Sequence, residues 1–381
     1  MYQPSESSPT SASVDLTALA QNVAHVRRLA PRADVLAVVK ANAYGHGAVE
    51  MTRALQQLAV RRFGVATVDE GVALRQAGIR DDVVVLGATM PAQFPDVAAH
   101  RLTPVLYRAD LVQAFAAAVE AGTAPYPIHI KVETGMGRLG VLPRDLPELL
   151  SRSELRGPLR LEGLMTHLAD ADNPDAGQTE EQLARFQQVL NQVQQRGLAI
   201  PLIHVANSAG IIKYPTSLHS LVRPGIMLYG YHTLANDMQG PELQPILTWK
   251  TTIAHMHTIP PGSSVSYNRT FIASRQTRVA VLPVGYARRL QPVALESWTG
   301  TDRRTTSAGD RTGLHGYDDG QRHGRARRPS WTGSNPHRTT GRWADHRSRP
   351  RRLATDHSLR DSLRHRSPST ASISPTCCFG R

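Results

Sequence analysis

Between residues 34 and 230 the sequence alternates short, continuously apolar runs with segments of helical periodicity. Continuously apolar runs are typical of parallel strands covered on both faces, because a strand with one wet face alternates apolar and polar residues instead. Helix-like stretches such as 69–78 and 180–197 each end in a glycine, where a helix C-cap belongs. The strand candidates are VLAVVKA (35–41), RFGVATV (62–68), VVVLGA (83–88), LTPVLY (102–107), PIHIKVE (127–133), LRLEGLMTH (159–167), IPLIHVA (200–206) and LVRPGIMLYG (221–230).

Eight strand-and-helix units in this span predict an α/β fold, a (β/α)₈ barrel of the TIM type. A doubly wound open sheet is the alternative, but no GxGxxG follows the first strand. After the polar link at 231–245, strand patterns follow one another without helices, which predicts the start of a separate, mainly β domain. We therefore predict four segments: a disordered lead-in (1–13), the barrel (14–235), the start of the β domain (236–287) and an atypical tail (288–381).

The net charge of +13 suggests a nucleic-acid-binding protein, but its distribution argues against one. Residues 288–381 contain 19 Arg, no Lys and 8 acidic residues, so nearly all of the excess charge lies in the tail. No apolar stretch has transmembrane length, and the first residues lack a secretory pattern. Cys377 and Cys378 are adjacent and imply no disulfide framework. We expect a cytoplasmic protein that uses neither nucleic acid nor membrane as a partner.

Polar residues recur at the ends of the predicted strands, where the active site of a parallel barrel gathers. One such residue has little meaning, but a cation, histidine or amide-and-hydroxyl pair at five strand ends indicates an anionic ligand. The residues are Lys40 with Tyr44, Lys131 with Arg138, His167, Asn207 with Ser208, and Arg223 before Pro224 and Gly225.

Each of these residues also has an ordinary structural interpretation. Lys40 can be a solvated strand-end lysine, His167 a hydrogen-bonded core histidine and Arg223 the cap of a turn. Lys40, however, directly follows VLAVV, so burial is expected to lower its pKa toward Schiff-base chemistry. A hydroxyl and backbone amides at the last two strands are the usual phosphate cup of such barrels. A Schiff-base lysine on the first strand together with that cup fits pyridoxal 5′-phosphate.

At these residues the sequence resembles the fold-type III pyridoxal-phosphate family, and within it the alanine racemases. The matching stretches lie in order between residues 37 and 287, and the first and third are long enough to be highly specific. They are AVVKANAYGHG, FGVATVDEG, HIKVETGMGRLG, LMTHLADAD, HVANSAG, VRPGIMLYG, VSYNRTF and LPVGYA.

The resemblance implies that Lys40 carries the cofactor as an internal aldimine and is the base for D-alanine. Tyr267 would be the opposing base for L-alanine, reaching the active site of the partner subunit of a homodimer. Tyr44, Ser208, Gly225 and Ile226 would hold the phosphate, Arg223 would face the pyridine nitrogen, and His167 and Asn207 would complete the cofactor site. Arg138 would bind the substrate carboxylate, Lys131 matches a position often carbamylated, and Tyr286 would lie near the substrate entrance. No metal is expected.

These roles agree with elementary chemistry. Inverting a stereocentre requires one base on each face of the reacting carbon. The cofactor supplies the electron sink and the protein supplies bases and electrostatics. An arginine opposite the ring nitrogen disfavours protonation there, which weighs against a related decarboxylase.

After Ala287 the family pattern stops, so the resemblance implies a C-terminal β domain that is incomplete in this chain. The expected motifs DGYSR, VCMD.TMV and YEILCG are absent as written, and the tail is too poor in apolar residues to build a core, so we expect it to be disordered. Reading Ala-Arg-Arg-Leu-Gln (287–291) as GCC CGA CGG CTA CAG and removing one C restores Ala-Asp-Gly-Tyr-Ser. The same shift permits CMDTTMVNV from 314–323 and ITLYEILCGIAPRV from 356–369, whereas 329–345 shifts less convincingly.

Our interpretation is an alanine racemase sequence whose gene carries one inserted base, with activity impaired by the altered tail. An RNA-binding tail is the alternative for 288–381, although it has scattered acids and no repeat. Two other functions remain open for the chain. One is a non-catalytic pyridoxal-phosphate barrel, and the other is a racemase of broader specificity or a related decarboxylase.

Overall fold

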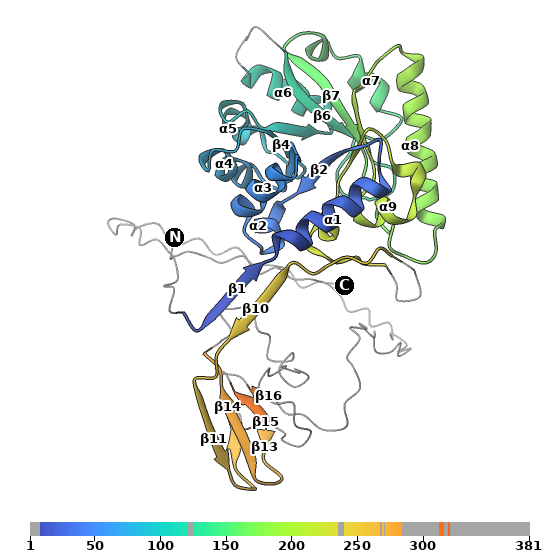
Figure 1. Ribbon diagram of the computed structural model, residues 1–381. Coiled ribbons are helices and arrows are strands. Elements are labelled where there is room, and N and C mark those ends of the chain that lie inside the picture. The colour runs from blue at the N-terminus through green and yellow to red at the C-terminus, as the bar shows by residue number, and fades with distance from the viewer. Residues whose placement is uncertain are drawn as a thin grey trace, which may run out of the picture. The chain divides into compact units, whose positions relative to one another are not determined.

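The computed structural model of the chain describes most of the first 283 residues and two short strands beyond them (Figure 1). The described residues are 8–119, 125–234, 240–266, 269, 271–283, 312–315 and 319–320.

Eight parallel strands form one sheet in the order β8-β7-β6-β5-β4-β3-β2-β9. The sheet closes where the Arg223 amide, just after β9, donates a 3.0 Å hydrogen bond to the Ala206 carbonyl, just after β8. The predicted α/β barrel and its eight strands are therefore confirmed. The strands are β2 (Asp34–Val38), β3 (Arg62–Val65), β4 (Asp82–Val85), β5 (Thr103–Leu106), β6 (Tyr126–Lys131), β7 (Leu159–Met165), β8 (Leu202–His204) and β9 (Leu221–Val222).

Helices connect and surround the strands (Figure 1). They are α1 (Leu16–Leu29), α2 (Lys40–Tyr44), α3 (Ala48–Gln57), α4 (Val68–Gln76), α5 (Phe94–Ala99), α6 (Ala109–Ala118), α7 (Leu146–Leu150), α8 (Gly177–Gln195) and α9 (Ser208–Lys213). Short 3₁₀ turns are η1 (Pro91–Gln93), η2 (Ser153–Arg156), η3 (Pro215–Ser217) and η4 (Ile226–Tyr229). Among the described helices, none is long and apolar enough to cross a membrane.

Local sequence explains where several helices begin and end. Asp15 caps α1, because its carboxylate accepts from the Thr17 and Ala18 amides at 2.8 and 3.0 Å. Past α4 and α8, Gly78 and Gly197 adopt left-handed φ angles of 87° and 68°, as the sequence predicts for a glycine C-cap.

The core has two layers. A large cluster fills the space between strands and helices, and a smaller one fills the barrel interior with Leu36, Val38, Val84, Val105, Met165 and Leu221. His129 and His204 also lie in this interior, and both are fully buried. A side chain at Gly163 would come within 2.5 Å of the His129 ring, so glycine is required beside it.

The strands outside the barrel follow the predicted change of pattern after residue 245. β1 (Thr10–Val14) pairs with β10 (Leu247–Thr251), β11 (His255–Ile259) with β14 (Thr277–Val281), and β12 (Ser264–Val265) with β13 (Phe271–Ile272), all antiparallel. Residues 10–13, assigned to a disordered lead-in from the sequence, are therefore part of a strand. The sequence pattern missed it because its partner lies more than 230 residues away.

Two strands lie within the tail that we expect to be disordered. β15 (Thr312–His315) pairs in parallel with β14, and β16 (Asp319–Gly320) pairs with β15. The open edge of a strand can pair through backbone groups with a segment of little apolar content, which explains why composition does not predict this contact. The rest of 284–381 lies outside the described residues.

Candidate active site

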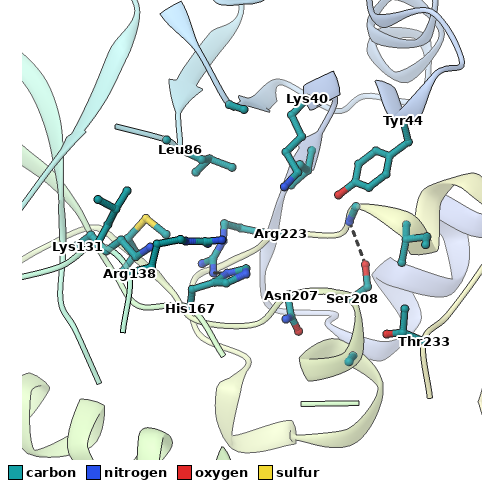
Figure 2. A pocket seen from close by; sticks show the side chains of 18 of the residues that line it. Lys40, Tyr44, Leu86, Lys131, Arg138, His167, Asn207, Ser208, Arg223 and Thr233 are labelled. Atoms are coloured by element: carbon teal, nitrogen blue, oxygen red, sulfur yellow. Dashed lines mark hydrogen bonds between the residues drawn. The ribbon is translucent and has the colours of Figure 1, made fainter. Parts of the chain in front are cut away.

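A cavity of about 470 Å³ lies at the carboxyl ends of the barrel strands. It brings together every barrel residue that the sequence predicts for the site, and Figure 2 shows Lys40, Tyr44 and Arg223 around one space. The predicted residues that line it are Lys40, Tyr44, Lys131, Arg138, His167, Asn207, Ser208, Arg223, Gly225 and Ile226. Tyr267 and Tyr286 lie outside the described residues.

Lys40 is displayed by an unusual turn of backbone. It follows β2, and the next four residues, 41–44, all have φ angles of 52–54°, a left-handed helical turn without glycine. Such a conformation costs roughly 1–2 kcal/mol per L-residue, so surrounding contacts must hold it. Asn42 supplies one of them, because its side-chain oxygen accepts from the Ala48 amide at 2.8 Å.

The Lys40 amine lies in a setting that disfavours its charged form. The residue is exposed through the cavity mouth, yet the cavity walls displace much of the water around it. This desolvation, reinforced by the charge of Arg138 and opposed by Glu70, lowers the Lys40 pKa from 10.5. A larger fraction of neutral amine is therefore available for attack on a carbonyl.

Tyr44, Ser208 and Gly225 line the same cavity as Lys40 and form what we call the hydroxyl cradle. The Ser208 hydroxyl oxygen accepts from the Gly225 amide at 3.0 Å (Figure 2) and from the Met227 amide at 3.3 Å, which leaves its O–H to donate to a ligand. A side chain at Gly225 would lie 2.6 Å from the Tyr44 hydroxyl, so only glycine permits this approach. Burial raises the Tyr44 pKa, which keeps the phenol protonated. Two hydroxyl donors therefore converge, as a phosphate group requires.

The other cradle residues have supporting positions. Asn207 accepts from the Gly210 amide at 2.9 Å and caps α9, so its oxygen serves the helix while the residue lines the cavity. Ile226 begins η4 directly after Gly225. Tyr229 was not predicted; its hydroxyl donates to the Val38 carbonyl at 2.9 Å, and its ring lies 5.0 Å from that of Tyr44.

Arg223 is buried behind the cavity, 3% exposed. Its Nη1 and Nη2 groups donate to the carbonyls of Thr166, His204 and Val205 at 2.6–2.9 Å. Within the described part of the chain, every hydrogen bond that this guanidinium donates comes from Nη1 or Nη2. Its Nε–H therefore remains for a ligand. Complete burial lowers the Arg223 pKa to about 9, which still leaves it cationic at neutral pH.

The guanidinium sets the tautomers of its histidine neighbours. Because arginine only donates, the Nδ1 atoms of His167 and His204 must accept from Arg223, at 3.1 and 3.2 Å. His204 therefore carries its proton on Nε2 and donates it to His129 Nδ1 at 3.0 Å. His129 then carries its own proton on Nε2, which lies 3.7 Å from the Glu162 carboxylate. A polar chain thus runs from the cavity through the barrel.

Cations dominate the remaining wall. Desolvation, together with the charges of Arg138 and Arg223, lowers the Lys131 pKa to about 8. Burial and the same neighbours hold the His167 pKa well below 6.5, so this imidazole is neutral. The ETGMGRLG loop that carries Arg138 is organised by Glu133, which accepts from the Gly135 and Arg138 amides at 2.6 and 3.3 Å. These groups suit a small carboxylate.

Some lining residues were not predicted from the sequence. Leu86, Met165, Asp172 and Thr233 face the cavity, and Glu70 contacts the turn after Lys40. Leu86 and Met165 lie inside the strand patterns 83–88 and 159–167, and the other three lie two to five residues past such a pattern. Residues at these positions usually serve only packing or solvation. No group of three metal-ligating side chains occurs among the described residues.

Comparison with known proteins agrees with this geometry. The alanine racemase N-terminal domain model matches residues 14–233, and the alanine racemase C-terminal domain model matches residues 246–308, continuing past Ala287.

Individual relatives cover most of the chain. It is 38% identical over 280 residues to the alanine racemase of Halothermothrix orenii, which is 73% of this chain and 74% of the relative. It is 39% identical over 280 residues to that of Carboxydothermus hydrogenoformans, 73% of this chain and 76% of the relative. The solved alanine racemase of Clostridium difficile 630 superposes with a TM-score of 0.71 at 30% identity, covering 76% of each chain. With this fold, this cavity and these matches, the chain belongs to the alanine racemase family.

Proposed function

We propose that this chain is an alanine racemase sequence that uses pyridoxal 5′-phosphate to interconvert L- and D-alanine. The observation that carries the proposal is that Lys40, the hydroxyl cradle and the buried Arg223 line one cavity. The family matches support the same activity, and D-alanine would serve peptidoglycan precursors in the cytoplasm.

The residues fit the cofactor on three counts. The Lys40 amine with its lowered pKa is suited to covalent attachment of an aldehyde. The two hydroxyls beside Gly225 form a cradle that a side chain would fill, as a phosphate site requires. The remaining Arg223 Nε–H is a cationic donor for the ring nitrogen. Tyr44, Ser208, Gly225 and Ile226 would hold the phosphate, with His167 and Asn207 beside them.

When bound, pyridoxal phosphate would supply an electron sink for the bond at the substrate Cα. Lys40 would move the Cα proton on the D face, and Tyr267 would do so on the L face, because inversion needs a base on each side. Arg138 would bind the substrate carboxylate with Lys131 close by, and Tyr286 would line the entrance. Arg223 has no proton acceptor, so it would keep the ring nitrogen unprotonated and disfavour decarboxylation.

The proposal includes a homodimer in which Tyr267 reaches the partner's cavity. It also includes a one-base insertion in the gene after codon 287, which would replace the remainder of the β domain. The resemblance implies that the missing VCMD.TMV segment would help hold the substrate carboxylate, so we expect the chain as written to have little turnover.

The test compares the chain as written with a chain whose reading frame is restored after Ala287. Each is incubated with pyridoxal phosphate, reduced with borohydride and digested, and Lys40 modification is measured by mass spectrometry alongside D-alanine formation. We expect modification at Lys40 in both chains and turnover at least tenfold higher in the restored chain. Equal D-alanine formation by the two chains would refute the expected impairment. A Lys40→Ala chain that retained as much reduced cofactor as the chain with Lys40 would refute the assignment of Lys40.

Cofactor binding without turnover is the second candidate for the chain as written. Among the described residues, those that line the cavity all lie between Val38 and Thr233, within the N-terminal domain match, so we expect attachment at Lys40 to proceed without the tail. Attachment at Lys40 without measurable D-alanine would favour this candidate.

A further inference from the structure

Glu70 lies in the first turn of α4, and its carboxylate connects the segments that follow β2 and β3. Its Oε1 atom accepts from the Ala41 amide and its Oε2 atom accepts from the Ala66 amide, both at 2.7 Å. Ala41 is the first residue of the left-handed turn after β2, and Ala66 directly follows β3. One carboxylate therefore holds both segments.

Ordinary helix capping does not account for this arrangement. Thr67 and Glu70 have the spacing of a capping box, and the Thr67 hydroxyl accepts from the Glu70 amide at 3.3 Å. In a capping box, the Glu carboxylate returns to the amide of the N-cap residue, here Thr67. Glu70 instead binds the amide one residue earlier and that of Ala41, 29 residues away in the sequence. Its side chain thus serves the Lys40 turn in addition to its own helix.

The left-handed turn needs such a partner. Four consecutive L-residues with φ above 50° store roughly 4–8 kcal/mol, and the turn presents Lys40 to the cavity only while it is held. A charged acceptor of a backbone hydrogen bond is worth about twice a neutral one.

Glu70 also has an electrostatic effect on Lys40. It opposes the desolvation and the Arg138 charge that lower the lysine's pKa. The other titratable or charged groups that line the cavity with Lys40 are Tyr44, Lys131, Arg138, His167, Asp172 and Arg223.

We propose that Glu70 is a positioning residue for Lys40, because its carboxylate holds the left-handed turn through the Ala41 amide and places a negative charge at the backbone next to the lysine. The proposal deepens the proposed function, because it concerns the amine assigned there as cofactor anchor and base. It can be tested without cofactor or alanine, so its failure is distinguishable from failure of the racemase assignment.

The test is the pH dependence of Lys40 acetylation in the full chain freed of cofactor, with exposed Lys250 as internal reference. Glu70→Gln removes the charge and leaves one acceptor oxygen for two amides. We expect the midpoint of Lys40 acetylation to fall by about 0.5–1 pH unit. Hydrogen exchange at Ala41 or Ala66 should accelerate about tenfold.

Asp69→Asn is the matched control, because it removes one charge from the same exposed helix turn and should leave the Lys40 midpoint unchanged. A Glu70→Gln chain that loses thermal stability but keeps the wild-type midpoint would show a merely structural cap and overturn the proposal. An equal shift in both variants would overturn it as well. If Glu70→Gln fails to fold, the wild-type chain decides: exchange-protected amides at both Ala41 and Ala66 support the proposal, and an unprotected Ala41 refutes it.

Discussion

At the scale of one residue, Lys131 is a buried cation surrounded by other cations. It is 2% exposed, and its pKa falls from 10.5 to about 8 through desolvation and the charges of Arg138 and Arg223. Between those two pH values the unfolded chain binds more protons than the folded chain. The free energy of unfolding therefore gains a contribution that rises with pH across this window, by about 1–3 kcal/mol in all.

Lys131→Met should remove that contribution. Urea unfolding of both chains at pH 7.5 and pH 10 provides the measurement, and the stability advantage of the Met variant should shrink at the higher pH. Lys250→Met, at an exposed position on β10, serves as control and should show no such difference. Parallel pH profiles for wild type and Lys131→Met would contradict the prediction.

At the scale of an element, the left-handed turn of α2 reverses the usual effect of glycine. Ala41 is exposed in the left-handed region, and Ala73 is exposed in the right-handed helix α4. Glycine relieves strain at Ala41, whereas at Ala73 it only adds freedom to the unfolded chain.

We predict that Ala73→Gly lowers the free energy of unfolding by about 1 kcal/mol. Ala41→Gly should leave it unchanged or raise it by up to about 1 kcal/mol, because relieved strain offsets the added freedom. Thermal or urea unfolding of the two variants checks this. Equal losses at the two sites would show that the turn is not left-handed in solution.

At the scale of the whole molecule, charge is distributed unevenly along the chain. Residues 288–381 contain 19 Arg and 8 acidic residues, whereas the preceding residues are nearly balanced. Such a segment should bind polyanions through counterion release, with a steep dependence on salt and none on sequence.

We therefore expect the chain as written to be retained on heparin at low salt and the frame-restored chain to pass through. The elution salt of each chain is the measurement. An RNA ligand bound in preference to scrambled RNA of equal length would instead favour the RNA-binding alternative for the tail.

Much of the fold and of the site followed from local sequence. Each barrel strand is a mainly apolar run, Lys40 and Arg223 stand directly after such runs, and His167 ends one. Parallel strands end at one rim, so residues at those ends converge whatever the details of packing. Alternation of apolar runs with helical periods was therefore sufficient to predict the barrel and its cavity.

Other features depended on contacts between distant segments. β1 exists because β10 pairs with it, and the positions of the His129 and His204 protons follow from the Arg223 guanidinium, which only donates. The Glu70 carboxylate likewise accepts hydrogen bonds from Ala41 and Ala66, which follow two different strands. Local sequence does not predict these contacts, because each one forms only when segments distant in the sequence come together in the folded chain.

The sequence by itself thus determined the barrel, the family and ten of the residues that line the cavity, since these depend on periodicity and on residues next to one another. Only the tertiary structure decided how those residues are held, which protons they can give and which backbone they strain. Hydrogen-bond direction and desolvation are properties of neighbours in space. The position of Lys40 depends on the strand that precedes it in the sequence. Its pKa depends on the cavity walls, Arg138 and Glu70, which only the fold brings near it.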